Sequence, residues 1–480
     1  MKHVLLSMFI MPAAVHAATY YVATNGNNNA AGTQAAPWRT IQYAVTNAMP
    51  GDTVVIGGGR YREHVRLIRS GTNNAPITFA AAPGAVPVID GENTVPPGNH
   101  SWAGLFEVVG RHNIRVEGLS AINSYSAGFF LRWATNVVVA RCSTSNTFTS
   151  GLQAWRSHTI QFVSNDVQFA CMGTNTGVDL QECITVSGTT NFVVAFNHVY
   201  NRPITSDSPG GEGIDAKQAC FRGAIHHNII HGIPGELALY VDAYNETLRE
   251  IDVYNNLIFG CKNGIVTAAE VSSGRVYDLR IFNNIVYGTL RHGIEVADYD
   301  ADARRERIYI YNNLCYSNGY RIVSPWGAGI YVSSKNVRDV FIWNNICHQN
   351  KSFQLGVSSS ADPYVKASHN LVYPYRNYNG GTEYEIRGAA YVEAHPLYVS
   401  EAGFDFHPTE FSPTRDAGTN LAWHTGAFDF DGAPRIHDAR VDIGAYEFVP
   451  EPQALALALL LALTLAARQG RCAARLHRNR

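Results

Sequence analysis

The amino-acid sequence predicts an all-β protein, a right-handed parallel β-helix that forms a three-strand solenoid with a short N-terminal capping helix. Three observations support this fold class. A phrase centred on asparagine recurs at intervals of 25 to 32 residues, a period typical of solenoids. Each interval holds three short stretches rich in β-branched and aromatic residues, which favour strands. The chain contains 42 Gly and only 16% charged residues, a composition that suits strands and turns.

The repeated phrase occupies residues 112–374. Stacked turns place equivalent residues about 4.8 Å apart, so we expect these asparagines to form a ladder in which each amide bonds to the next. Asparagine also tolerates the left-handed backbone of a tight turn. We therefore interpret the repeated residue as structural, and it recurs at Asn165, Asn197, Asn228, Asn256, Asn284, Asn313, Asn345 and Asn370.

Residues 18–111 form the predicted N-terminal cap and the first turns. Within PWRTIQYAVTNAMPGD, apolar residues recur at helical spacing, which predicts an amphipathic helix that covers the first open turn. The segment YYVATNGNNNAAGTQAAPWRTIQYAV and the following GDTVVIGGGRYRE resemble the N-terminal part of many secreted β-helical polysaccharide lyases.

The cysteines of the chain are widely scattered. None of the eight forms a CxxC pair, which argues against a zinc site. We expect most of them to be buried small hydrophobic residues. Export to an oxidising compartment would also permit a disulfide between Cys171 and Cys183.

Residues 375–448 form the predicted C-terminal cap. The motifs SPTRDAG (412–418), DFDGAPR (429–435) and VDIGAYEF (441–448) resemble the domain called choice-of-anchor Q, which precedes one of several bacterial surface anchors. We expect its aspartates to close turns. Binding of a cation by these aspartates is the alternative.

The first residues predict export. Residues 1–17 begin with basic Lys2 and His3, continue with an apolar run and end in Val15-His16-Ala17. This is the pattern of a cleavable signal peptide, so we expect the mature chain to start near Ala18 outside the cytoplasm.

The last residues, 449–480, predict sorting to the cell envelope or surface. A Val-Pro-Glu-Pro box precedes an apolar run from Ala454 to Ala467 and a cluster of arginines. This order resembles the PEP-CTERM sorting signal, which implies an exosortase-type enzyme as partner and a short, transient inner-membrane helix. Its arginines would stay on the cytoplasmic side. A plain C-terminal membrane anchor is the alternative.

The candidate chemistry lies on the third strand of each turn, where alternation identifies the outward side chains. Like charges on adjacent strands repel, a cost that Ca²⁺ would remove because it binds oxygen ligands. A solvated face on which Lys217 pairs with Asp215 or Asp242 is the alternative. The loop at 202–211 adjoins these turns. The residues expected to cluster there are Glu182, Glu212, Asp215, Lys217, Tyr240 and Asp242.

The segment GEGIDAK (211–217) resembles the sites of calcium-dependent β-helical lyases of uronic-acid polysaccharides. The resemblance implies Lys217 as the catalytic base and Tyr240 as the acid that protonates the leaving oxygen. Chondroitinase-like lyases have an arginine where this chain has Asp242, a departure from the pattern. The implied Ca²⁺ ligands are Glu182, Glu212, Asp215 and Asp242.

The sequence therefore predicts an exported, monomeric protein that acts on extracellular polysaccharide, as a Ca²⁺-dependent lyase or epimerase of a uronic-acid glycan. One alternative is a glycoside hydrolase on the same scaffold, with Asp215 and Asp242, or Glu212, as acid and base. The other is a noncatalytic glycan-binding or biofilm-matrix protein. The formal net charge of −2 and the lack of a basic stripe argue against nucleic acid as a partner.

Overall fold

The computed structural model describes residues 17–97, 102–174, 181–203, 210–300, 302–320, 327–437 and 439–450. Nearly all of the predicted signal peptide and sorting signal lies outside these residues. Within them, no helix is long and apolar enough to cross a membrane. The chain divides into two units, one of residues 1–224 and 228–236 and the other of residues 225–227 and 237–480.

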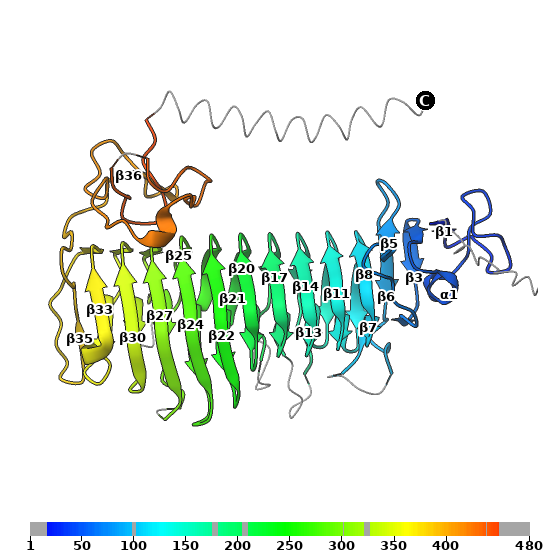
Figure 1. Cartoon of the computed structure of the whole chain (residues 1–480), viewed down its shortest axis with the longest axis horizontal. Helices are drawn as coiled ribbons and strands as arrows, with labels where there is room; N and C mark the ends of the chain where they lie inside the picture. The colour runs from blue at the N-terminus through cyan, green and yellow to red at the C-terminus, as the bar shows by residue number, and fades with distance from the viewer. Residues whose placement is uncertain are drawn as a thin grey trace, which may run out of the picture. The chain divides into compact units, whose positions relative to one another are not determined.

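The first unit opens with the capping helix that the sequence predicts. Helix α1 (Ile41–Asn47) buries Ile41, Ala44 and Val45 and contacts β1 and β4 (Figure 1). The Thr40 side chain accepts a hydrogen bond from the Tyr43 amide, which satisfies one of the free N–H groups at the start of a helix. The carboxylate of Glu63 accepts two more, from Ile41 and Gln42.

Three columns of parallel strands follow in the first unit, as expected for three strands per turn (Figure 1). The first column contains β1 (Thr19–Val22), β2 (Thr53–Ile56), β5 (Ile77–Ala81), β8 (His112–Glu117), β11 (Thr135–Ala140), β14 (His158–Val163) and β17 (Thr190–Ala195). The second contains β3 (Gly59–Tyr61), β6 (Pro87–Asp90), β9 (Ser120–Ser124), β12 (Ser143–Thr147), β15 (Asp166–Gln168) and β18 (His198–Tyr200). The third contains β4 (Val65–Arg66), β7 (Gly104–Val109), β10 (Ala127–Arg132), β13 (Leu152–Trp155), β16 (Ile184–Ser187) and β19 (Ile214–Lys217).

The second unit repeats this plan. Strands β20 (Phe221–His226) and β21 (Ile229–Ala243) contribute residues to both units. The first column of the second unit contains β22 (Thr247–Tyr254), β24 (Arg275–Phe282), β27 (Arg304–Tyr311), β30 (Val337–Trp343) and β33 (Val365–Ser368). The long strand β23 (Leu257–Ala269) starts both other columns. One continues with β25 (Ile285–Tyr287), β28 (Leu314–Tyr316), β31 (Ile346–His348) and β34 (Leu371–Tyr373), the other with β26 (Ile294–Val296), β29 (Ala328–Val332) and β32 (Phe353–Ser358).

The asparagine ladder is present in both units. Asn165 Nδ2 donates to Asn197 Oδ1, and Asn197 Nδ2 donates to Asn228 Oδ1, each at 2.9 Å. In the second unit the same bonds join Asn256, Asn284, Asn313, Asn345 and Asn370 at 2.9–3.0 Å. The predicted structural ladder is therefore confirmed.

The expectation that the ladder asparagine adopts the left-handed backbone is wrong. The preceding residue adopts it, as Asn283 does at φ 53° and His227 at φ 54°. This residue forms the corner, so the next side chain can turn into the core. There Asn284 Nδ2 also donates to the Val253 carbonyl at 2.9 Å.

The cysteines behave as buried hydrophobic residues. The seven within the described ranges are free and buried, so the disulfide considered between Cys171 and Cys183 is not formed. The Cys171 thiol instead donates to the Gln181 carbonyl at 3.4 Å, and burial raises its pKa well above the usual value, which keeps it protonated.

The segment after the last turns covers an outward apolar face of the second unit. Ile285, Leu314, Ile346 and Leu371 form one column on neighbouring strands, and Ile443 and Ala445 pack against it. This segment contains β36 (Tyr398–Ser400) and β37 (Asp405–Pro408). Its aspartates close turns, as predicted, because Asp429 Oδ1 accepts hydrogen bonds from the amides of Asp431 and Ala433.

Candidate functional site

Lys217 and Glu182 form an ion pair in the first unit. Lys217 ends β19, and Glu182 lies two residues before β16, the adjacent strand. Lys217 Nζ is 2.6 Å from Glu182 Oε1, and the other oxygen of Glu182 accepts a hydrogen bond from Thr185 at 2.8 Å. Glu182 is a partner that the sequence analysis did not name, because only Asp215 and Asp242 were considered.

The face around this ion pair is not the solvated surface considered as an alternative. Thr185 and Ser187 are fully buried, Asp215 is 2% exposed and Glu182 is 4% exposed. Carboxylates in such a place are costly unless they are paired, protonated or bound to a cation.

Glu212 provides the strongest indication of a cation site. Desolvation and the charge of Glu182 raise the pKa of Glu212 to about 8, so this carboxyl holds a proton at neutral pH. Its Oε2 atom has no hydrogen-bond partner among the described residues. An unsatisfied buried oxygen beside a second carboxylate fits an oxygen-liganded cation such as Ca²⁺.

Tyr240 and Asp242 belong to the second unit. The Tyr240 hydroxyl donates to Glu270 Oε1 at 2.8 Å, and its ring packs against Val266 and Ala297. Burial raises the pKa of Tyr240 well above 10. Asp242 is 3% exposed. The Tyr240 hydroxyl is therefore buried and already paired with Glu270. The predicted role of Tyr240 as an acid does not explain this pairing.

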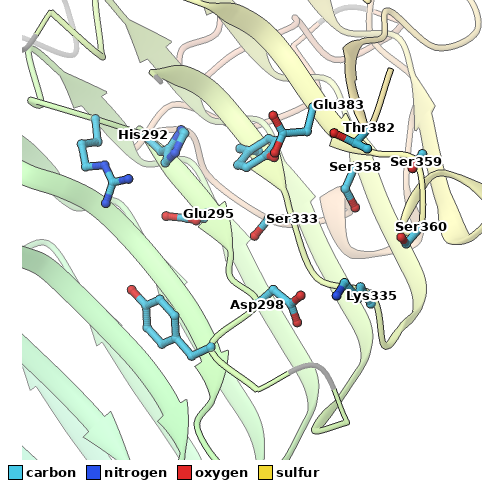
Figure 2. A pocket seen from close by; sticks show the side chains of 13 residues that line it. His292, Glu295, Asp298, Ser333, Lys335, Ser358, Ser359, Ser360, Thr382 and Glu383 are labelled. Atoms are coloured by element: carbon cyan, nitrogen blue, oxygen red, sulfur yellow. The ribbon is translucent and has the colours of Figure 1, made fainter. Parts of the chain in front are cut away.

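A pocket of about 530 Å³ opens on the second unit. The labelled side chains of Glu295, Asp298, Ser333 and Lys335 line one hollow (Figure 2). Arg291, His292, Tyr299, Tyr331 and Glu383 complete its charged and aromatic lining. The pocket thus combines carboxylates, cations and aromatic rings, which are the groups that bind charged sugars.

Two groups in this pocket have strongly shifted pKa values. Burial raises the pKa of Glu295 to about 7, although Asn263 donates a 2.8 Å hydrogen bond to its carboxyl group. Burial lowers the pKa of His292 to about 3, and its Nδ1 atom accepts a hydrogen bond from the Ala328 amide. Glu295 can therefore donate a proton near neutral pH, whereas His292 stays neutral.

Sequence reasoning missed this pocket. Glu295 and Tyr331 occupy the same column as Asp215 in the repeat, and the observed register confirms that Glu295 lies opposite Tyr331. That shared column was the available signal. Glu383 had no such signal, because it comes from β35 (Glu383–Glu385), an antiparallel strand outside the repeat.

The fold and these faces define a parallel β-helix protein with acidic and basic side chains on its third strands. The family model described as "Pel9A-like, right handed beta helix region" matches residues 20–182, and one described as "Disaggregatase related" matches residues 276–379. The chain therefore contains a Pel9A-like right-handed β-helix region, which agrees with the predicted fold class. Neither match reaches residues 412–448 or 449–480, so the likenesses to choice-of-anchor Q and to PEP-CTERM stay predictions.

Individual proteins support the same conclusion. The chain is 32% identical over 151 residues to pectate lyase PEL9 of Emericella nidulans, across 29% of this chain and 36% of that protein. It is 35% identical over 101 residues to the uncharacterized protein YwoF of Bacillus subtilis, across 21% of each. The matches thus span about a third and a fifth of these relatives.

Solved structures show the same fold. The crystal structure of pectate lyase Pel9A superposes with a TM-score of 0.53 and 16% identity, across 90% of this chain and 96% of that one. The complex of XylC with xylose gives a TM-score of 0.52 and 13% identity, across 79% and 86%. At these identities the likeness extends to the fold alone.

Proposed function

We propose that this protein cleaves a uronic-acid polysaccharide by β-elimination on the third-strand face that carries Lys217. The observation that carries the proposal is the ion pair of Lys217 and Glu182 beside protonated Glu212. Glu182 is the last residue of the region that matches a Pel9A-like β-helix, and Glu212 and Lys217 lie beyond that region. The similarity to a pectate lyase supports a uronic-acid substrate.

Lys217 is the proposed base. In its uncharged form, the amine would accept the proton from the carbon beside the substrate carboxylate while the bond to the leaving glycosidic oxygen breaks, which leaves an unsaturated sugar. Glu182 stabilises the resulting ammonium at 2.6 Å. Return of the proton to the opposite face of the carbon, without bond cleavage, would make the same site an epimerase.

Ca²⁺ is the proposed cofactor. Glu182, Glu212 and Asp215, all in the first unit, would hold it. When bound, it would neutralise the substrate carboxylate and acidify the adjacent C–H group. The proton on Glu212 is the one that cation binding would release.

A pair of aromatic rings at the same column supports sugar binding. Arg132, Trp155, Ser187 and Lys217 lie in register on neighbouring strands. The Arg132 guanidinium lies 4.7 Å from the Trp102 ring, and Trp102 and Trp155 contact edge to face at 4.7 Å. Rings of this kind stack on sugars, and an arginine pairs with carboxylates.

The test follows the ultraviolet absorbance of the unsaturated product with pectate, alginate and glycosaminoglycan, in the presence of Ca²⁺ or EDTA. A Ca²⁺-dependent rise that Lys217→Ala abolishes and Lys335→Ala keeps would establish the lyase and its base. No rise with any substrate would overturn the proposal. Loss in Lys335→Ala but not in Lys217→Ala would move the reaction to the pocket of the second unit.

Glycoside hydrolysis in that pocket is the second candidate. Glu295 favours it, because a carboxyl with a pKa of about 7 can serve as a general acid near neutral pH. Release of reducing ends without Ca²⁺, lost in Glu295→Gln, would select the hydrolase. Binding of polysaccharide without turnover would select a glycan-binding matrix protein.

We also propose that the chain is exported and sorted to the cell envelope or surface by an exosortase-type enzyme. The patterns of residues 1–17 and 449–480 support this location, and an extracellular polysaccharide substrate requires it. Detection of a processed chain at the cell surface, lost when 449–480 are deleted, is the test.

A further inference from the structure

We propose that His348, His395 and Glu401 form a binding site for a divalent transition metal, Zn²⁺ in particular, which fastens the C-terminal segment to a sheet face of the second unit. One ligand atom from each of the three residues lies within 4.8 Å of the others. His348 ends β31, whereas His395 and Glu401 flank β36. The site thus joins two parts of the second unit that lie far apart in sequence.

The position of His348 is unfavourable for a histidine that binds no metal. It lies in register with Tyr316 and Tyr373 on the neighbouring strands, so both of its neighbours in this aromatic column are tyrosines. The His348 side chain is fully buried, and neither ring nitrogen has a hydrogen-bond partner among the described residues. An unsatisfied buried polar group costs about 1–3 kcal/mol, which a tyrosine or phenylalanine at this position would avoid.

The chemistry of His348 suits a metal ligand. Burial lowers the pKa of this imidazole to about 4, so the ring is neutral at physiological pH and offers a lone pair. A second buried polar group without a hydrogen-bond partner among the described residues lies nearby, the hydroxyl of Tyr398. The Tyr398 ring lies 5.7 Å from that of His348. Tyr398 can hydrogen-bond a water in the fourth coordination position.

Hydrogen bonds already orient the Glu401 carboxylate as they orient a metal ligand. Its Oε2 atom lies 3.0 Å from His395 Nε2, and its Oε1 atom accepts a 2.8 Å hydrogen bond from the Tyr316 hydroxyl. Outer partners of this kind orient the ligands of metal sites. Because Tyr316 bonds to Oε1, the Oε2 atom of Glu401 can replace its contact with His395 by a bond to a metal ion that both residues share.

The donor set decides the class of metal. Two imidazoles and one carboxylate suit Zn²⁺ and its neighbours, whereas Ca²⁺ takes six to eight oxygens. Bonds of about 2.0–2.1 Å would bring tetrahedral ligand atoms to about 3.4 Å from one another. The pair formed by His395 and Glu401 is already this close. The ligand atoms all lie within 4.8 Å of one another, so binding requires His348 and that pair to approach by at most about 1.4 Å.

One hydrogen bond must be given up. His395 Nδ1 accepts from the Leu397 amide at 3.1 Å, whereas metal binding at Nε2 places a proton on Nδ1. Leu397 is exposed and holds a left-handed backbone at φ 56°, a conformation costly for leucine. Leu397 keeps a second backbone hydrogen bond, in which its carbonyl accepts from the Thr409 amide at 3.1 Å.

The site escaped the sequence analysis because only cysteine spacing was considered for zinc. The two histidines lie in different parts of the fold, one in the repeat and one after it, so no local motif connects them. Only the folded chain brings them together.

Zn²⁺ content measured by mass spectrometry tests the proposal. The full-length protein is stripped with EDTA, loaded with Zn²⁺ and separated from free metal. We expect one Zn²⁺ per wild-type chain, at least tenfold weaker binding in His395→Gln and in Glu401→Gln, and a higher melting temperature of the wild type with Zn²⁺. Co²⁺ in place of Zn²⁺ should give visible ligand-field bands only in proteins that retain the site.

His407→Gln is the matched control. His407 contacts the carboxylates of Asp405 and Asp431, which makes it a rival metal site in the same unit, and this variant should keep its Zn²⁺. His348→Phe should lose Zn²⁺ yet remain folded, because phenylalanine suits the aromatic column. If this variant unfolds, His395→Gln decides, since its side chain is partly exposed. Absence of stoichiometric Zn²⁺ in the wild type, or retention in both His395→Gln and Glu401→Gln, would overturn the proposal.

Discussion

Lys217 and Glu182 share an ion pair between adjacent strands, with Nζ and Oε1 2.6 Å apart and side chains only 14% and 5% exposed. Loss of one partner leaves the other charge in a largely buried place, which typically destabilises a protein by 3–5 kcal/mol. We expect Glu182→Gln to lower the free energy of unfolding by about 3 kcal/mol. Urea denaturation measures the change.

The exposed ion pair of Lys366 and Asp339 provides the control for that prediction. Its side chains are 59% and 54% exposed at a separation of 3.2 Å, so Asp339→Asn should change the free energy of unfolding by less than about 1 kcal/mol. An equal loss of unfolding free energy in both variants would show that burial does not increase the contribution of the Lys217 ion pair to stability.

Asn284 is expected to be among the most sensitive positions of the ladder. Its Nδ2 atom donates to Asn313 and to Val253, and its Oδ1 atom accepts from the amide of Asn256. Asn284→Ala leaves several buried groups unsatisfied, so we expect a loss of about 3 kcal/mol in the free energy of unfolding. Asn379→Ala, at an exposed position, should stay within about 0.5 kcal/mol of wild type. Similar losses in the two variants would contradict a structural role for the ladder.

The ladder also shows why the fold was predictable and the site was less so. A period of stacked strands fixes which residues lie above one another, so the pairing of Ile184 with Ile214 followed from the sequence and is observed. The clustering of Lys217 with Glu182 was expected, but their ion pair was not, because only Asp215 and Asp242 were considered as partners of Lys217. Alternation gives the direction of a side chain but not its burial. Asp215 was expected to point outward, and the structure adds that this residue is only 2% exposed.

Glu295 should make the stability of the protein depend on pH. Burial raises its pKa from 4.5 to about 7, so between these values the folded state holds a proton that the unfolded state has released. The stability due to neutral Glu295 is therefore fully present below about pH 4.5 and is lost as pH rises through about 7. Urea midpoints measured across this range should fall less in Glu295→Gln than in the wild type. Glu410→Gln, at an exposed position, should keep the wild-type slope, and an unchanged slope in Glu295→Gln would refute the assignment.

Trp155 tests whether substrate lies along the column that leads to Lys217. It stands in register with Arg132 on one side and Ser187 on the other, and its ring contacts that of Trp102. A ring that stacks on a sugar distant from the reacting bond contributes equally to the ground state and the transition state, so its loss raises KM and leaves kcat unchanged. We expect Trp155→Ala to raise KM for the polysaccharide about tenfold, equivalent to about 1.4 kcal/mol of binding. Trp343→Ala, which removes a partly buried ring from the first column of the second unit, is the control for lost packing. If Trp343→Ala raised KM as much, or if Trp155→Ala lowered kcat alone, the bound sugar chain would not follow this column.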